Sequence, residues 1–159
     1  MTRIALLDDG DAGALAAALR AAGHDARVVR APSVEVVDLL LARRGFTGPL
    51  SHAPLLAARL AAGGFDVAHA FTAVDAVAAQ AWRALGGGRV VFTCRETLDR
   101  SSLADRRLRL WALRRAVERS DAVAAASEPA RDALWRWMAV EAPVVPLDDA
   151  RAQLRLYGI

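Results

Sequence analysis

The sequence predicts an α/β fold, a three-layer, doubly wound and mainly parallel sheet of about six strands with helices on both faces. Short apolar runs alternate along the chain with longer segments of helical periodicity, which is the pattern of repeated βαβ units. Hydrophobic residues make up 55% of the chain, and many are alanines, which favours close packing of helices on a sheet. With 159 residues, we expect a single domain spanning residues 1–159.

The N-terminal part predicts two strands separated by a helix. The first strand is expected at residues 3–7 and the first helix at 11–22, ending at Gly23. A second strand is expected at 26–30, closed by Pro32. Glycine and proline mark these boundaries because glycine adopts the left-handed conformation that ends helices and proline cannot continue a pairing ladder.

The middle of the chain predicts two helices followed by two further strands. Helices are expected near 34–44 and 54–62, and a strand at 66–70. A helix at 73–85 then leads through three glycines into a strand at 89–93.

The C-terminal part begins with the longest predicted helix, at 102–119. Ser102 and Asp105 have the spacing of a capping box, in which each side chain satisfies a free backbone N–H. A strand at 122–126 is followed by a helix with Pro129 in its first turn, where proline costs no hydrogen bond.

A last short strand at 143–145 and a helix at 148–156 complete the predicted elements. In such an open sheet, functional loops lie at the carboxyl ends of the strands.

Composition excludes several classes of function. The net charge is +3, and all 21 basic residues are arginine, so the charge alone gives little support for nucleic-acid binding. Trp135 and Trp137 point to different sides of a helix and form no common stacking platform, so no nucleic acid is expected as a partner.

The single cysteine, Cys94, allows no intrachain disulfide and fits a cytoplasmic location. The three histidines are far apart in the sequence, and no metal site is predicted.

The loop after the first strand is acidic. Asp8, Asp9 and Asp11 surround Gly10 and would repel a diphosphate, which argues against a dinucleotide site. Carboxylates at a strand end can instead accept hydrogen bonds from sugar hydroxyls. Asp9 and Gly10 are therefore candidate site residues, whereas Asp11 is expected mainly to cap the following helix.

Polar residues also follow the third and fourth strands. His69 faces one side of the predicted sheet, either as a hydrogen-bonded core residue or as a base. Thr72 stands at the strand tip, where it can contact a ligand or cap the next helix. Arg95 could hold a phosphate or carboxylate and Glu96 could accept from hydroxyls, or the two could form a surface ion pair.

The helix expected at 102–119 is rich in arginine. Leu103, Leu110, Leu113 and Val117 share one side of it, and Arg106 interrupts that stripe. Such a face is usually solvated, but it leaves open contact with an anionic membrane surface, which would make the protein peripheral to the inner membrane face.

Three segments together resemble glycosyltransferase family 4. Residues 13–29 resemble its first helix and second strand, residues 65–70 its third strand, and residues 120–134 its strand-serine-helix segment, in which Ser127 is a possible site residue. The resemblance implies the N-terminal, acceptor-side domain of a GT-B glycosyltransferase, with a Rossmann-like fold.

The chain departs from this family at the expected acceptor cleft. The family usually has a glycine pair where this chain has Asp9-Gly10-Asp11, and often a second histidine at the position of Phe71. It also often has a histidine near Cys94 or Arg95. The donor-binding domain is absent from these residues. The segment 144–147 resembles the family's crossing between domains, and the tail to Tyr157 resembles a terminal helix that crosses back.

The resemblance implies the acceptor-side half of an enzyme that transfers a sugar from a nucleotide-sugar to a hydroxyl acceptor. It implies no activity for the chain alone and no cofactor, because the nucleotide-sugar would bind only with the missing domain. The partner is then a donor-binding domain or a second chain. The alternative is a non-catalytic interaction module that pairs with another chain. The acceptor-binding residues expected from the strand ends are Asp9, Gly10, Thr72, Arg95 and Glu96.

Overall fold

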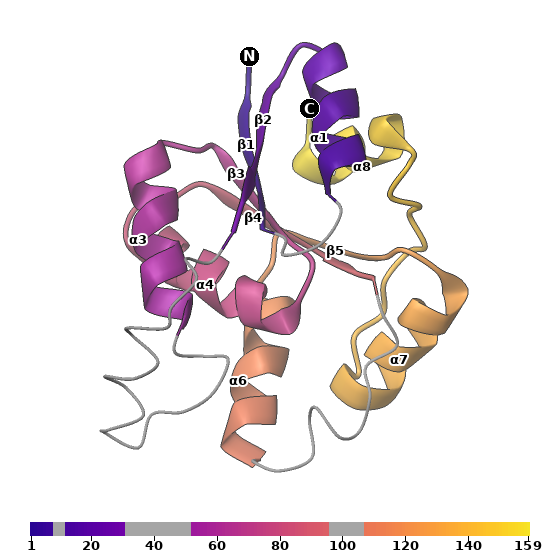
Figure 1. The fold of residues 1–159 in the computed structure, drawn as a ribbon. Coiled ribbons are helices and arrows are strands. Elements are labelled where there is room, and N and C mark those ends of the chain that lie inside the picture. Colours follow the sequence, from indigo (N-terminus) through magenta and orange to yellow (C-terminus); the bar gives the residue numbers. More distant parts are fainter. Residues whose placement is uncertain (8–11, 31–51, 96–106) are drawn as a thin grey trace.

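The computed structural model describes residues 1–7, 12–30, 52–95 and 107–159, and its elements form three layers around a parallel sheet (Figure 1). The sheet has five strands in the order β2-β1-β3-β4-β5, and every pairing is parallel. The strands are β1 (Arg3–Leu7), β2 (Asp25–Val29), β3 (Val67–Ala70), β4 (Arg89–Cys94) and β5 (Ala122–Ala125). The predicted Rossmann-like α/β fold is confirmed.

The expected sixth strand at 143–145 is wrong in extent. Val144 forms only an isolated parallel bridge with Ala125. The nitrogen of Val145 donates to the oxygen of Ala125 (2.7 Å), and the nitrogen of Ala125 donates to the oxygen of Pro143 (2.9 Å). Pro143 has no N–H to donate, so the ladder cannot continue towards the N-terminal side of this pair of bonds.

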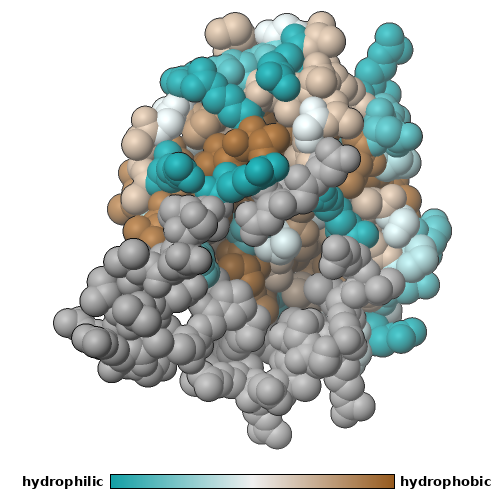
Figure 2. Space-filling model, viewed as in Figure 1, coloured by the Kyte–Doolittle hydropathy of each residue, from teal (hydrophilic) through white to brown (hydrophobic). Residues whose placement is uncertain are grey.

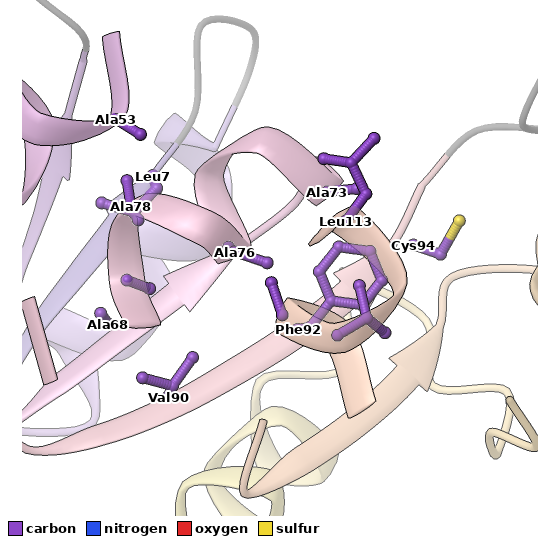
Figure 3. Close-up of a cluster of buried hydrophobic side chains, with 14 of the residues drawn as sticks. Leu7, Ala53, Ala68, Ala73, Ala76, Ala78, Val90, Phe92, Cys94 and Leu113 are labelled. Carbon is purple, nitrogen blue, oxygen red and sulfur yellow. The ribbon is translucent and has the colours of Figure 1, made fainter. Parts of the chain in front are cut away.

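One face of the sheet is covered by four helices, α3 (Ala53–Gly63), α4 (Ala73–Ala84), α6 (Arg107–Glu118) and α7 (Glu128–Met138). Figure 3 shows small side chains of α4, including Ala76 and Ala78, lying among Ala68, Val90 and Phe92 of the sheet. Alanine lets a helix approach a sheet closely, which explains why an alanine-rich sequence forms this layer. Almost all side chains of this core are apolar.

The opposite face is covered by α1 (Gly13–Ala21) and α8 (Ala150–Tyr157), which contact each other and lie side by side in Figure 1. Leu15, Ala16 and Leu19 of α1 are buried against Ile4 and Leu6 of the sheet. Side chains of a strand point to opposite sides in turn, so the alternate residues Val67, His69 and Phe71 all face this side of the sheet. The first and last helices therefore share one core.

Glycine is required where β4 starts. A Cβ at Gly88 would collide with the backbone oxygen of Asp66, whereas the nitrogen of Arg89 donates to that same oxygen (2.9 Å). Only a residue without a side chain lets β4 approach β3 here.

Several sequence predictions fall outside the described residues. These are the helix near 34–44, the capping box of Ser102 and Asp105, and the first residues of the helix at 102–119. The other helices begin and end within a few residues of the predicted positions.

Candidate functional site

A cavity of about 270 Å³ lies between α1, the residues that follow β3 and β4, and the segment before α8. The sheet order reverses between β1 and β3, since β2 lies on one side of β1 and β3 on the other. Open parallel sheets bind ligands at this reversal, outside the carboxyl ends of the strands. The cavity is lined by α1, by the residues after β3 and β4, and by the segment before α8: Ala12, Ala14, Leu15, Ala18, Phe71, Arg95, Leu147 and Asp148.

Arg95 and Phe71 form the wall of this cavity on the sheet side. The guanidinium carbon of Arg95 lies 4.5 Å from the centre of the Phe71 ring, within the range of a cation–π contact. Phe71 is buried and Arg95 is half-buried. Stacking orients the guanidinium, and its N–H groups are suited to a phosphate, carboxylate or hydroxyl oxygen.

His69 lies behind this wall and is completely buried. One ring nitrogen (Nδ1) is 2.7 Å from the hydroxyl oxygen of Tyr157, and the other (Nε2) is 2.8 Å from Oγ1 of Thr93. A neutral imidazole has one donor and one acceptor nitrogen, and each hydroxyl can take either role, so both bonds can form together. His69, Thr93 and Tyr157 are called the buried triad below.

Burial, together with the positive charge of Arg95, lowers the pKa of His69 to about 3. The imidazole is therefore neutral near pH 7. Burial also raises the pKa of Tyr157, so its hydroxyl keeps its proton. Both nitrogens of His69 are occupied within the core, which supports the core interpretation of this residue over the interpretation as a base.

The buried triad connects α8 to the cavity wall. The rings of His69 and Phe71 are 4.3 Å apart between centroids, and the rings of His69 and Tyr157 are 5.4 Å apart and nearly perpendicular. A continuous line of contacts therefore runs from Tyr157 through His69 and Phe71 to Arg95.

Thr72 and Ser127 both act as helix caps in the structure. Oγ1 of Thr72 accepts from the nitrogen of Asp75 (3.1 Å) and donates to the Asp75 carboxylate (2.7 Å) at the start of α4. Oγ of Ser127 accepts from the nitrogen of Ala130 (3.3 Å) at the start of α7. Neither residue is among those lining the cavity.

The remaining predicted site residues, Asp9, Gly10 and Glu96, lie outside the described residues. Asp11, expected as a helix cap, also lies there. The N-cap position of α1 is occupied by Ala12, one residue later than expected, and it makes no side-chain capping bond.

Sequence reasoning missed Leu147 and Asp148, which form the wall of the cavity next to α8. They precede a helix whose start is capped by Asp149, with the nitrogen of Ala152 donating to its carboxylate (2.9 Å). The sequence signals that helix, but nothing in it shows that the helix returns to β3.

The apolar stripe predicted on the arginine-rich helix faces the core where it can be described. Leu113 and Val117 are buried, and Nε2 of Gln80 on α4 donates to the oxygen of Ala116 (3.1 Å). Leu103 lies outside the described residues, and nothing is described of the side chain of Leu110. Leu113 and Val117 therefore cannot insert into a membrane. Contact of the exposed arginines with a membrane surface stays a prediction.

Within the described ranges, no group of three or more acidic, histidine or cysteine side chains is placed to hold a metal ion. No helix in the same part of the chain is long and apolar enough to cross a membrane.

Residues 12–146 match the family model of Glycosyltransferase Family 4, and the chain therefore belongs to that family. No curated protein matches the chain at comparable stringency.

Solved structures share the fold. Anabaena HepE, whose crystal structure contains UDP and glucose, superposes with a TM-score of 0.62 at 16% identity, over 92% of this chain and 45% of HepE. Sucrose-phosphate synthase of Thermosynechococcus elongatus gives a TM-score of 0.63 at 17% identity, over 98% of this chain and 53% of that chain. A second structure of that synthase also gives 0.63 at 16% identity, over 98% of this chain and 95% of that one.

At these identities the likeness establishes the fold alone. The chain spans about half the length of HepE and of the longer sucrose-phosphate synthase chain.

Proposed function

We propose that this member of Glycosyltransferase Family 4 forms the acceptor-side half of an enzyme that transfers a sugar from a nucleotide-sugar to a hydroxyl acceptor. The observation that carries the proposal is the cavity at the strand reversal, where Phe71 holds the guanidinium of Arg95 at one wall. Asp148 also lines the cavity, and its carboxylate can accept hydrogen bonds from hydroxyls.

The acceptor would bind against this wall. Arg95 would donate hydrogen bonds to acceptor oxygens, and the apolar side chains of α1 would pack on the carbon framework. Asp9, Gly10 and Glu96, which follow the same strand ends in sequence, are proposed to complete the acceptor contacts. Thr72 is not needed for them, because its hydroxyl is already bonded to Asp75 at the start of α4.

A donor-binding domain, on the same or on a partner chain, is proposed to bring the nucleotide-sugar. The share of HepE and of the longer synthase that this chain covers, 45% and 53%, supports this division of labour. Transfer would then require the two halves to close on both substrates and exclude water. A cytoplasmic location, expected from the single cysteine, stays a prediction.

The interaction-module alternative gains no particular support. The large hydrophobic side chains exposed in the described residues lie on different elements or at the ends of the chain: Met1, Leu55, Leu85, Trp111, Trp135 and Ile159. On the face shown in Figure 2, hydrophobic atoms outside the grey region lie among hydrophilic ones.

The proposal is tested by thermal-shift titration of the chain with nucleotide-sugars, free nucleotides and a panel of sugar and sugar-phosphate acceptors. A ligand that binds only the folded state raises the melting temperature. We expect acceptors to raise it and nucleotides to leave it unchanged. Arg95→Ala should strongly reduce the acceptor effect, and Arg136→Ala, which replaces an exposed arginine of α7, serves as the matched control. Stabilisation by nucleotide-sugars, with none by acceptors, would contradict the proposal.

A further inference from the structure

A second hollow, of about 370 Å³, lies on the outer surface of α7. It is lined by Arg131, Asp132 and Trp135 of the helix and by Val140, Glu141 and Ala142 of the segment that follows. None of these residues lines the cavity at the strand ends. The hollow therefore belongs to a different surface from the proposed acceptor site.

The hollow exists because the chain turns back sharply after α7. Ala139 has a positive φ of 53°, the only non-glycine residue of the described ranges with this conformation. This left-handed residue ends the helix, and in the segment that follows Val140 and Ala142 pack against the core while Glu141 is exposed. The helix forms one wall and the returning segment forms the other.

Trp135 stands in this hollow with 57% of its surface exposed. The inner face of α7 is already filled by Ala130, Leu134 and Met138, which pack on the sheet. Trp135 is therefore not required for the core, and its ring offers a flat apolar platform to solvent.

Polar groups surround that platform. Arg131 and Asp132 lie four and three residues before Trp135, so all three share one side of the helix. The guanidinium of Arg131 is fixed by ion pairs with Glu128 and with Asp132 (3.4 Å). Glu141 is on the facing segment, so carboxylates stand on both walls.

We propose that this hollow is a non-catalytic binding site for a sugar ring. One face of a pyranose carries C–H groups, which pack on an indole, and its hydroxyls donate to carboxylates and accept from a guanidinium. Trp135 provides the platform, Asp132 and Glu141 accept from hydroxyls, and Arg131 donates. The volume is at the lower end of the roughly 300–1,000 Å³ of small-molecule sites, which suits one ring of a glycan rather than a large ligand.

Two other ligand classes fit the charges less well. A nucleotide could stack its base on Trp135, but Asp132 and Glu141 would repel its phosphates. An organic cation would be attracted by the carboxylates and the indole, but Arg131 in the same hollow would oppose it. A neutral polyol satisfies all three charged groups at once.

The test is a tryptophan-fluorescence titration of the full chain with methyl glucoside and with gluco-, galacto- and manno-configured trisaccharides. We expect at least one glycan to give a saturable change, with a dissociation constant on the order of 1 mM, as for a shallow site. Trp135→Ala should abolish it. Trp111→Ala is the matched control, because Trp111 of α6 is 64% exposed and does not line the hollow, and it should leave the change intact.

Glu141→Gln and Asp132→Asn should each weaken binding roughly tenfold or less without changing the circular dichroism spectrum, since both side chains are exposed. Arg95→Ala should leave this binding unaffected, which separates it from the acceptor site. The proposal is overturned if no glycan gives a saturable change. It is also overturned if the change survives in Trp135→Ala, or if choline or UMP binds in the hollow more tightly than every glycan.

Discussion

The two faces of the sheet are built from different kinds of side chain. The face under α3, α4, α6 and α7 is packed almost entirely with apolar residues. The three fully buried polar side chains of the described ranges, His69, Thr93 and Gln153, belong to the side that carries α1 and α8. The cavity at the strand ends also opens on this second side. One face therefore consists mainly of apolar core, and the other combines buried polar groups with the cavity proposed as the acceptor site.

The cost of burying polar groups explains why the buried polar side chains of this face are hydrogen-bonded. A buried hydroxyl or imidazole is tolerated only when it is hydrogen-bonded. The buried triad meets this condition, and Nε2 of Gln153 donates to the oxygen of Pro146 (3.2 Å), which holds the segment before α8. These bonds fix α8 in one position on the sheet, and residues 147 and 148 of the cavity wall with it.

The largest loss of stability is expected from a substitution on the apolar face. Phe92 is buried between the sheet and the helices above it (Figure 3). Phe92→Ala should lower the free energy of unfolding by about 3–5 kcal/mol, because it removes a large side chain from a packed core. Urea denaturation measures this loss. A loss below that of His69→Phe would contradict the assignment of stability mainly to this face.

Replacing His69, the centre of the buried triad, should lower the free energy of unfolding by less, but it should also change acceptor binding. His69→Phe leaves the hydroxyls of Thr93 and Tyr157 without their partner, which should cost about 2–4 kcal/mol. The same variant should weaken acceptor binding, because a phenyl ring without the two hydrogen bonds of the imidazole can shift against the adjacent ring of Phe71. Denaturation and the acceptor titration, run on one preparation, measure both effects. Unchanged stability would show that the triad does not fix α8.

Stability should also depend on pH through His69. The pKa is about 3 in the folded protein and near 6.5 when unfolded, so the unfolded chain binds the extra proton between these values. The contribution of neutral His69 to the free energy of unfolding is therefore fully present above about pH 7. It decreases as the pH falls, by about 2 kcal/mol between pH 7 and pH 5. Denaturation across this range checks the slope, which should disappear in His69→Phe. A slope that persists in that variant would assign the effect to other groups.

The smallest loss of stability is expected from substitutions at the helix caps. Thr72→Ala should cost about 1 kcal/mol, because the nitrogen of Asp75 loses its acceptor at the start of α4. Acceptor binding should not change. Thermal denaturation and the acceptor titration distinguish the two roles, with Thr72→Ser, which keeps the hydroxyl, as the control. Weaker acceptor binding at unchanged stability would return Thr72 to the site.

Local signals predicted most of the fold. The apolar runs located all five strands, and the glycines after residues 62 and 85 marked the ends of α3 and α4. The sixth strand was wrong because only Val144 pairs with β5, and Pro143 before it has no N–H with which to continue the ladder. Strand alternation also placed His69 correctly on a buried face.

The site was less accessible to sequence reasoning because its contacts join distant residues. His69 and Tyr157 are 88 positions apart, and the stacking of Arg95 on Phe71 depends on the pairing of β3 with β4. The hollow at Trp135 depends on a left-handed alanine, for which the sequence carries no signal. Residue type and strand order indicated Arg95, but not what holds its guanidinium.

Nuclear magnetic resonance of the isotopically labelled chain can locate acceptor binding at the cavity of the strand reversal. Amide shifts would be followed during titration with the sugar and sugar-phosphate panel. If the acceptor binds there, the perturbations should cluster at Ala12, Phe71, Arg95 and Leu147 and should disappear in Arg95→Ala. Perturbations confined to other parts of the chain, or produced at these residues only by nucleotides, would contradict it.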